Sequence, residues 1–551
     1  MKFLKALINA LICGLFFCCL LALLFADLNI NSALDLFFLG RLALVLFLTY
    51  GLIAAFVCLS TFGIYTFFSS RKNIAFISPT FLSLGFSLLT VLFLLIFRGN
   101  TVYFRSFFGV HTQTLLKHQM IALLILAAAG VLACLIYYRR PKRALVFVFY
   151  FVIGAALVGY AFYRRPDNAL PGPSSKLISL ETRNSGKKVT IIELDGLSFD
   201  FVIPLISADK LPNFSLLVEQ GSWGRLGSFT PNDAYILSAS FRTGKLPAKH
   251  RQVSPLAYRI GSIKQELEVI PRFIFFKQLT RTGLLKVSPN QPRSRPKDIW
   301  QIFSDSRLRS IRRDDPGSVD PGKNPARAET LFNLFYKDLQ NDPSQAVRLA
   351  KEAFFRDCSY EDAAFSERVA LGPQVFGLRL DGLTLVEKFF YGYSFPEAAA
   401  GLSSEETTKY ASVIERYYQF YDQVIGKYLA ALKEDELFIV FSAHGIEPLP
   451  FWKRVVEFVS GNPEVSAFHE LAPEGAVFFY GKNINREKNI EGMRLLDIAP
   501  TTLYYLGLPV GKDMDGIVRS SLFLRDFTAE NPILSISSYE DYALKPGPQS
   551  P

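Results

Sequence analysis

The sequence predicts two structural parts: an N-terminal α-helical transmembrane bundle and a doubly wound, mostly parallel α/β sheet domain with a cap insertion. Five long apolar runs lie within residues 1–165. Strand-like runs then alternate with helix-like stretches over residues 189–525, the pattern of a parallel sheet covered by helices. A charged, Pro- and Gly-rich stretch at about 250–370 interrupts this alternation. We interpret it as a cap inserted into the α/β domain.

The apolar runs are long enough to cross a bilayer. Residues 6–26 contain no charged side chain, and comparable runs lie at about 42–68, 74–97, 119–138 and 144–163. A hydrocarbon core of about 30 Å needs about 20 helical residues. A cleaved signal peptide fits the first run less well, because no small-residue cleavage site precedes a polar mature start and four further runs follow. We therefore expect about five transmembrane helices.

Positive charges in the short loops predict the orientation of these helices. Lys2 and Lys5 precede the first run, Arg71 and Lys72 separate the second from the third, and RRPKR at 139–143 separates the fourth from the fifth. Such segments favour the cytoplasmic side. Five crossings then place the large C-terminal domain outside the cytoplasm, in a plasma or inner membrane. The asymmetry is modest because the opposite loops also contain Lys and Arg.

The charge and the cysteines exclude two other classes of protein. Up to Arg165 the chain has 14 Lys and Arg against two Asp, so the 46 basic and 47 acidic residues that remain nearly cancel. The polar part therefore has no basic excess for nucleic acid, and membrane lipid is the expected partner. Of the six cysteines only Cys358 lies in the polar part. That part has no internal disulfide, so its stability must come from a core.

The polar part can be divided along the chain. Residues 166–188 are rich in Pro, Gly and Ser and are expected to form a linker. Residues 189–194 form a predicted buried strand, and residues 211–221 and 408–433 have helical spacing. The apolar run 437–442 is a second buried strand. Within the cap a loop is expected near 310–328, and residues 526–551 are expected to form a C-terminal tail.

The strand at 437–442 is followed by Ala443, His444 and Gly445. Ligands of open α/β sheets bind outside the carboxyl ends of the strands. An alanine can do no chemistry there, so the position raises the question of what has been removed. Taken alone, His444 is expected to be a structural histidine, and Asp195-Gly196 after the first strand is an ordinary turn dipeptide.

Six segments occur in a characteristic order: Asp195-Gly196, then residues 211–231, 238–250, 442–448, 469–484 and 495–516. Together they resemble the alkaline phosphatase superfamily, and most closely its type I phosphodiesterase/nucleotide pyrophosphatase branch. The resemblance covers most of residues 189–520. In number of spans and order of domains, the chain is also similar to envelope enzymes of that superfamily, such as lipoteichoic acid synthases and phosphoethanolamine transferases.

The resemblance implies a site with two metal ions, usually zinc, that hold a phosphoryl or sulfuryl group while a Ser or Thr attacks it. Asp195 matches the first aspartate ligand, and Ala234 falls on the nucleophile. The family's paired aspartate and histidine fall on Thr384 and Lys388, and its Asp-His-Gly is here Ala443-His444-Gly445. The last histidine ligand matches His469. The resemblance therefore implies that Ala443 stands at a position where the family has an aspartate ligand.

Only three of the six ligand positions keep a ligand, and the nucleophile position is a methyl group. A missing hydroxyl removes the covalent route. The implied protein is a pseudoenzyme that serves as a binding or assembly module in the cell envelope, with an envelope protein, a glycan or a lipid as partner and no cofactor. The ammonium of Lys388 is expected to occupy a vacated cation position.

The alternative is an active metal-dependent phosphodiesterase, phosphatase or phospho-head-group transferase with a rearranged site. A shift of register would offer Asp233, Asp381 and Glu387 as ligands for zinc or another divalent metal. Whether the chain is an enzyme therefore stays open. A transporter is disfavoured, because an ion pathway predicts ionisable residues deep in several spans and these spans have almost none.

Overall fold

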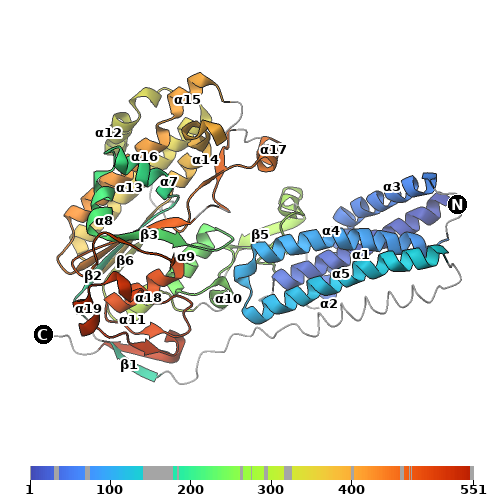
Figure 1. The fold of residues 1–551 in the computed structure, drawn as a ribbon, viewed down its shortest axis with the longest axis horizontal. Coiled ribbons are helices and arrows are strands. Elements are labelled where there is room, and N and C mark those ends of the chain that lie inside the picture. The colour runs from blue at the N-terminus through green and yellow to red at the C-terminus, as the bar shows by residue number, and fades with distance from the viewer. Residues whose placement is uncertain are drawn as a thin grey trace. The chain divides into compact units, whose positions relative to one another are not determined.

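The structure is a computed structural model, and it describes residues 2–29, 36–68, 75–139, 178–182, 185–260, 265–274, 276–290, 296–314, 325–398, 402–459, 464–470, 472 and 474–546. The fifth apolar run at 144–163 and most of the expected linker lie outside these residues. The chain divides into two compact units (Figure 1). The first comprises residues 1–172 and 247–294, and the second comprises residues 173–246 and 295–551.

The first unit is built on apolar helices. They are α1 (Lys2–Leu28), α2 (Leu36–Leu46), α3 (Leu52–Phe68), α4 (Pro79–Tyr103) and α5 (Val110–Arg139), with a π-helical turn, Phe47–Gly51, joining α2 to α3. Among the described residues these elements form four helices long and apolar enough to cross a membrane. The bent pair α7 (Phe199–Ser207) and α8 (Pro212–Gln220) also passes that test, but its apolar side chains belong to the core of the second unit.

Residues 247–294, expected in the cap, pack on these helices. They contain α10 (Pro247–His250), β4 (Leu256–Ile260) and β5 (Leu285–Pro289). The buried Asn29 side chain donates to the Val269 carbonyl at 2.8 Å and accepts from the Glu268 and Val269 N–H groups at 2.8 Å. Asn100 makes a similar pair of bonds to the Arg272 backbone, at 3.1 and 2.7 Å. These buried asparagines pair with backbone N–H and C=O groups of residues 268–272, and the hydrogen bonds fix this segment to the helices.

The second unit contains a mixed eight-stranded sheet in the order β12-β3-β11-β8-β2-β7-β6, with β13 also paired to β3. Only β11 among these strands runs antiparallel to its neighbours. The bounds are β2 Lys188–Leu194, β3 Ser222–Gly227, β6 Ser310–Arg313, β7 Val375–Leu380, β8 Glu436–Phe441, β11 Gly475–Tyr480, β12 Lys488–Asn489 and β13 Met493–Arg494.

Helices cover both faces of this sheet, because successive strand residues point to opposite sides. In β8, Phe438 and Val440 belong to one apolar core, and Leu437, Ile439 and Phe441 belong to another. The first core is completed by α7, α8, α12 (Pro325–Phe335), α13 (Gln345–Leu371), α14 (Gly382–Ser394) and α16 (Val413–Ala430). The second core is completed by α9 (Ala234–Thr243), α11 (Ile299–Asp305), α18 (Ile498–Tyr505) and α19 (Arg525–Glu530).

Shorter elements complete the second unit. They are β1 (Ile178–Thr182) with β16 (Tyr542–Pro546), β9 (Glu447–Pro448) with β10 (Ala467–Phe468), β14 (Val510–Gly511) with β15 (Ser535–Ile536), α15 (Ser404–Tyr410) and α17 (Phe451–Val459). Two expectations need correction. Part of the loop expected near 310–328 is strand β6, which pairs with β7. The expected C-terminal tail contributes Phe527 and Tyr539 to the core, so it belongs to the domain.

Candidate functional site

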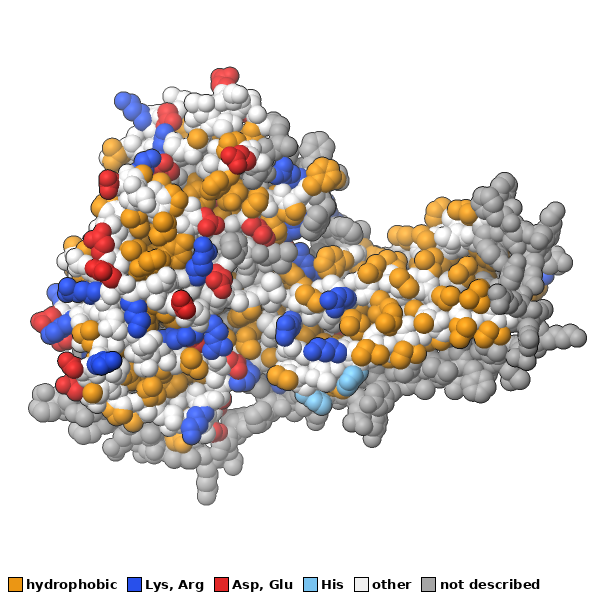
Figure 2. All heavy atoms as spheres, viewed as in Figure 1, with side chains coloured by type: hydrophobic (Ala, Val, Ile, Leu, Met, Phe, Trp, Pro, Cys, Tyr) orange, Lys and Arg blue, Asp and Glu red, His pale blue; other side chains and the backbone are white. Residues whose placement is uncertain are grey.

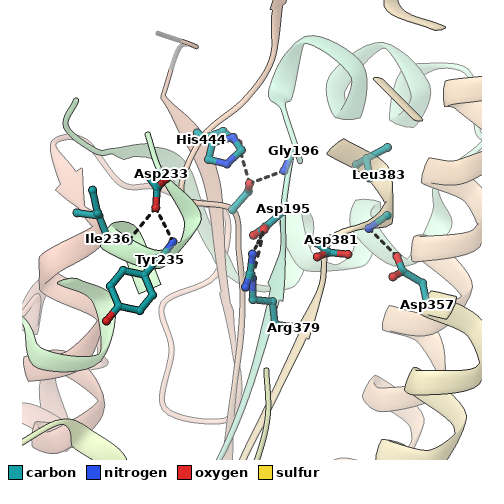
Figure 3. A network of polar contacts seen from close by, with 12 residues as sticks. Asp195, Gly196, Asp233, Tyr235, Ile236, Asp357, Arg379, Asp381, Leu383 and His444 are labelled. Atoms are coloured by element: carbon teal, nitrogen blue, oxygen red, sulfur yellow. Dashed lines mark hydrogen bonds and ion pairs between the residues drawn. The ribbon is translucent and has the colours of Figure 1, made fainter. Parts of the chain in front are cut away.

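The candidate site lies where β2, β7 and β8 end at the same edge of the sheet. Asp195 follows β2, Asp381 follows β7, and Ser442 follows β8. The Ser442 hydroxyl accepts from the Gly196 N–H at 3.1 Å and donates to the His444 carbonyl at 2.7 Å, which joins the ends of β2 and β8 (Figure 3). Gly196 is required here, because its φ is +92° and a Cβ would lie 2.5 Å from Glu387 Oε2.

Asp195 is paired with an arginine from the neighbouring strand. The Arg379 guanidinium donates to Asp195 Oδ2 from Nη2 at 2.5 Å and from Nε at 3.2 Å (Figure 3). Both side chains are largely buried, and Arg379 lies opposite Glu193 in the parallel β2–β7 pairing. Burial, together with the nearby Asp195 charge and against the opposing effect of Arg379, raises the pKa of Glu193 to about 8. The guanidinium therefore supplies the positive charge on which this buried acidic pair depends.

The two retained histidines lie together. The rings of His444 and His469 are stacked with centroids 5.0 Å apart and planes 22° apart. Nδ1 of His444 lies 3.0 Å from the Gly445 carbonyl. The pKa of His469 is lowered to about 4, chiefly by burial and also by His444 and Lys388, while Glu470 and Asp195 oppose this shift. His469 is therefore a neutral ring at pH 7 that responds to the charges of both Asp195 and Lys388.

The substituted positions offer no replacement ligands. Ala234 is the exposed first residue of α9, and Ala443 is buried in the apolar core. Thr384 and Lys388 lie one turn apart on α14. In the described part of the chain Lys388 has no ion-pair partner, and its ammonium lies 5.9 Å from the Phe389 ring centroid.

The three alternative ligands have other structural roles. Asp233 caps α9 by accepting from the Tyr235 and Ile236 N–H groups at 3.0 and 3.4 Å (Figure 3). Asp381 forms an ion pair with Arg356. Glu387 is wholly buried, accepts from the Tyr418 hydroxyl at 3.1 Å, and burial holds its pKa well above the ordinary value. Burial therefore favours the neutral form of Glu387, which is a poor ligand for a cation.

These donors do not fit a dimetal centre. Among the described residues, no three His, Cys, Asp or Glu side chains gather as a group that could hold a metal ion. The structure brings His444 and His469 together, but the Asp195 carboxylate faces Arg379 instead of a vacant coordination position. Glu387 Oε2 and the Thr384 hydroxyl are buried near Gly196 without a hydrogen-bond partner. A protonated carboxyl and a hydroxyl are weak ligands for a dication.

Sequence reasoning missed Arg379, Ser442 and Asn232. Asn232 is buried and donates to the His469 carbonyl at 3.1 Å, so it connects the start of α9 to the histidine pair. For Arg379 a signal existed, because VFGLRL at 375–380 is otherwise apolar and a charge in a buried strand needs a partner. Ser442 and Asn232 had no comparable signal.

Comparison with protein-family models gives no match, and comparison with curated proteins gives none either. Among solved structures, the phosphonate monoester hydrolase SpPMH from Silicibacter pomeroyi is similar, with 14% identity and a TM-score of 0.37. The match covers 61% of this chain and 76% of that chain. The class of protein that the fold defines is an α/β protein with a mixed sheet and N-terminal helices able to cross a membrane.

Proposed function

We propose that this chain is a membrane-anchored, externally facing pseudoenzyme of the alkaline phosphatase superfamily, from its type I phosphodiesterase branch. Its cleft serves as a binding or assembly module in the cell envelope. One observation supports this above all others: the buried carboxylate of Asp195, at the retained ligand position, is held by the Arg379 guanidinium. A guanidinium there supplies the charge that a metal ion would otherwise supply, and it adds no chemistry.

The rest of the site is consistent with this reading. A metal ligand must direct free lone pairs at the cation, whereas Asp195 Oδ2 already accepts two hydrogen bonds from Arg379. Ala234 provides no nucleophile and Ala443 provides no carboxylate. What remains is a pair of stacked imidazoles with the Lys388 ammonium close enough to lower the pKa of one of them. Such a site favours binding of an anionic ester group from a glycan, lipid or protein over its hydrolysis.

Metal analysis of the purified full chain, combined with turnover of an aryl phosphodiester, tests this proposal. We expect far less than one zinc per chain, no turnover, and a melting temperature that neither chelator nor added zinc changes. Asp233→Ala and Glu387→Gln serve as matched variants. Stoichiometric metal together with turnover that either variant abolishes would instead establish the rearranged hydrolase or transferase.

The external location needs its own test. A reporter enzyme that is active only after export, fused after Gly172, should be active in cells. A reporter that works only in the cytoplasm, fused at the same position, should be silent. The reverse pair of results would invert the topology while leaving the pseudoenzyme proposal intact.

A further inference from the structure

Helix α17 (Phe451–Val459) turns its charged residues toward its own domain. The Lys453 ammonium is 2.9 Å from Glu470 Oε2 and 3.6 Å from the centroid of the Phe468 ring. Nε of Arg454 donates to the Leu449 carbonyl at 3.0 Å. A surface helix of a water-soluble domain normally points such residues at solvent and buries its apolar stripe. In α17 this arrangement is reversed.

Two apolar residues of α17, Phe451 and Val455, point away from the domain. Phe451 is 81% exposed and Val455 is 47% exposed. They lie four residues apart and so share one face of the helix. No other large apolar side chain among the described residues of the α/β unit is as exposed as Phe451. Figure 2 shows apolar side chains on the surface at the position of α17.

The chain itself keeps a bilayer within reach of this face. Four helices of the first unit can cross a membrane. In the sequence, only the 14 residues 164–177 separate the apolar run at 144–163 from β1. Even fully extended, they span about 50 Å at about 3.5 Å per residue. The tether therefore keeps the α/β domain close to the membrane surface, and this proximity favours even a weak contact between the two.

The composition of α17 matches that surface better than it matches a protein groove. Phe451 and Trp452 precede Lys453 and Arg454. Aromatic residues are enriched at the boundary between headgroups and acyl chains, and Lys453 and Arg454 are already paired within the domain. We propose that α17 lies in the surface of the bilayer that anchors the chain, with Phe451 and Val455 inserted below the headgroups.

The contact would also orient the candidate site. α17 connects β9 to β10, and these short strands lie between His444 and His469 in the chain. Insertion of α17 would hold this edge of the domain at the bilayer, within reach of lipid-borne groups. The inference does not depend on what the site binds, because it rests only on the exposed face of α17 and on the tether.

The test places a single tryptophan on α17 in the full chain, reconstituted in nanodiscs. Trp223, Trp300 and Trp452, the only three tryptophans, are replaced by Phe, and Phe451→Trp is added. Leu334→Trp in the same background is the matched control, because Leu334 is 70% exposed on α12 of the same domain. Nanodiscs are prepared with lipids brominated in the upper acyl chain and with unbrominated lipids.

Brominated lipid should quench the emission of Phe451→Trp by about twofold, since interfacial helices insert about 5–10 Å, and should leave Leu334→Trp unchanged. Val455→Trp provides a second reporter of the same face, and unchanged far-UV circular dichroism verifies folding. Equal emission from both lipids at positions 451 and 455 would overturn the proposal. So would blue-shifted but unquenched emission, because a protein surface would then cover the face.

Discussion

The two sides of the candidate site bury carboxyl groups in different ways. On the β2 side, Asp195 is held by the Arg379 guanidinium. On the α14 side, Glu387 and Asp357 are held by tyrosines: Tyr418 donates to Glu387, and Tyr417 and Tyr421 donate to Asp357 at 2.9 Å each. A cation balances a buried charge, whereas neutral hydroxyls favour removing the charge by protonation. The first side therefore pairs its carboxyl group with a cation, whereas the second side favours the protonated form of its carboxyl groups.

The largest expected effect comes from removing the cation on the first side. Arg379→Met should lower the free energy of unfolding by about 3–5 kcal/mol, because it leaves Asp195 buried beside Glu193 without a counter-ion. Arg416→Met, which breaks the pair with the half-exposed Asp338, is the control and should cost less than about 1 kcal/mol. Denaturant unfolding of the solubilised full chain measures both. If Arg379→Met and Arg416→Met lowered the free energy of unfolding equally, Arg379 would not be compensating a buried charge on Asp195.

Smaller effects are expected on the second side. Glu387→Gln should change the free energy of unfolding at pH 7 by less than about 1 kcal/mol, because the native carboxyl is already neutral and the amide keeps an acceptor for Tyr418. Glu387→Ala should cost about 2–4 kcal/mol, since it leaves that hydroxyl unpaired beside a cavity. The same unfolding assay compares the two. If Gln were as harmful as Ala, the native carboxyl would have to be ionised.

The comparison is also visible in pH dependence. Burial raises the pKa of Asp357 from its ordinary 3.8 to about 7. Because the folded state binds this proton more tightly, the contribution of Asp357 to stability is greatest below pH 4 and is lost as the pH rises toward 7. Asp357→Asn has no such carboxyl to ionise and does not suffer this loss. The melting temperature of the variant minus that of the native chain should therefore increase between pH 4 and pH 7. A difference that stays constant across this range would contradict protonation of Asp357.

Much of the fold was predictable, because its signals are local. The strand at 189–194 and the helix at 211–221 correspond to β2 (Lys188–Leu194) and α8 (Pro212–Gln220). The helix expected at 408–433 is α16, which begins later, at Val413, because α15 ends at Tyr410. The placement of residues 247–294 on the N-terminal helices depends on Asn29 and Asn100, whose partners lie 240 and 172 residues away. Spacing along the chain gives no such information.

Less of the site could be predicted. Motif alignment indicated Asp195, His444 and His469 as ligand positions, and this role stays a prediction, although the structure does stack the rings of the two histidines. Motif alignment could not indicate that Arg379 is the counter-ion of Asp195, because that contact depends on the β2–β7 register. It also offered Asp233 as an alternative ligand, although the helix cap formed by Asp233 is visible only once α9 is known to begin at Ala234.

The smallest effect tests whether Lys388 acts as a cation within the site. The pKa of His469 is lowered from 6.5 to about 4, chiefly by burial, and the Lys388 ammonium makes only a small contribution to this shift. Because the unfolded chain binds this proton more tightly, the contribution of His469 to stability is fully present above pH 6.5 and is lost as the pH drops toward 4. Lys388→Met should raise the pKa of His469 and so reduce that loss, by less than about 1 kcal/mol, since one pKa unit corresponds to about 1.4 kcal/mol. Lys482→Met, which removes an exposed lysine paired with Glu434, should leave the acid limb of the stability curve unchanged. If both variants have the same acid limb, the Lys388 ammonium does not act on the histidine pair, and the charge proposed to stand in for a metal ion comes from Arg379.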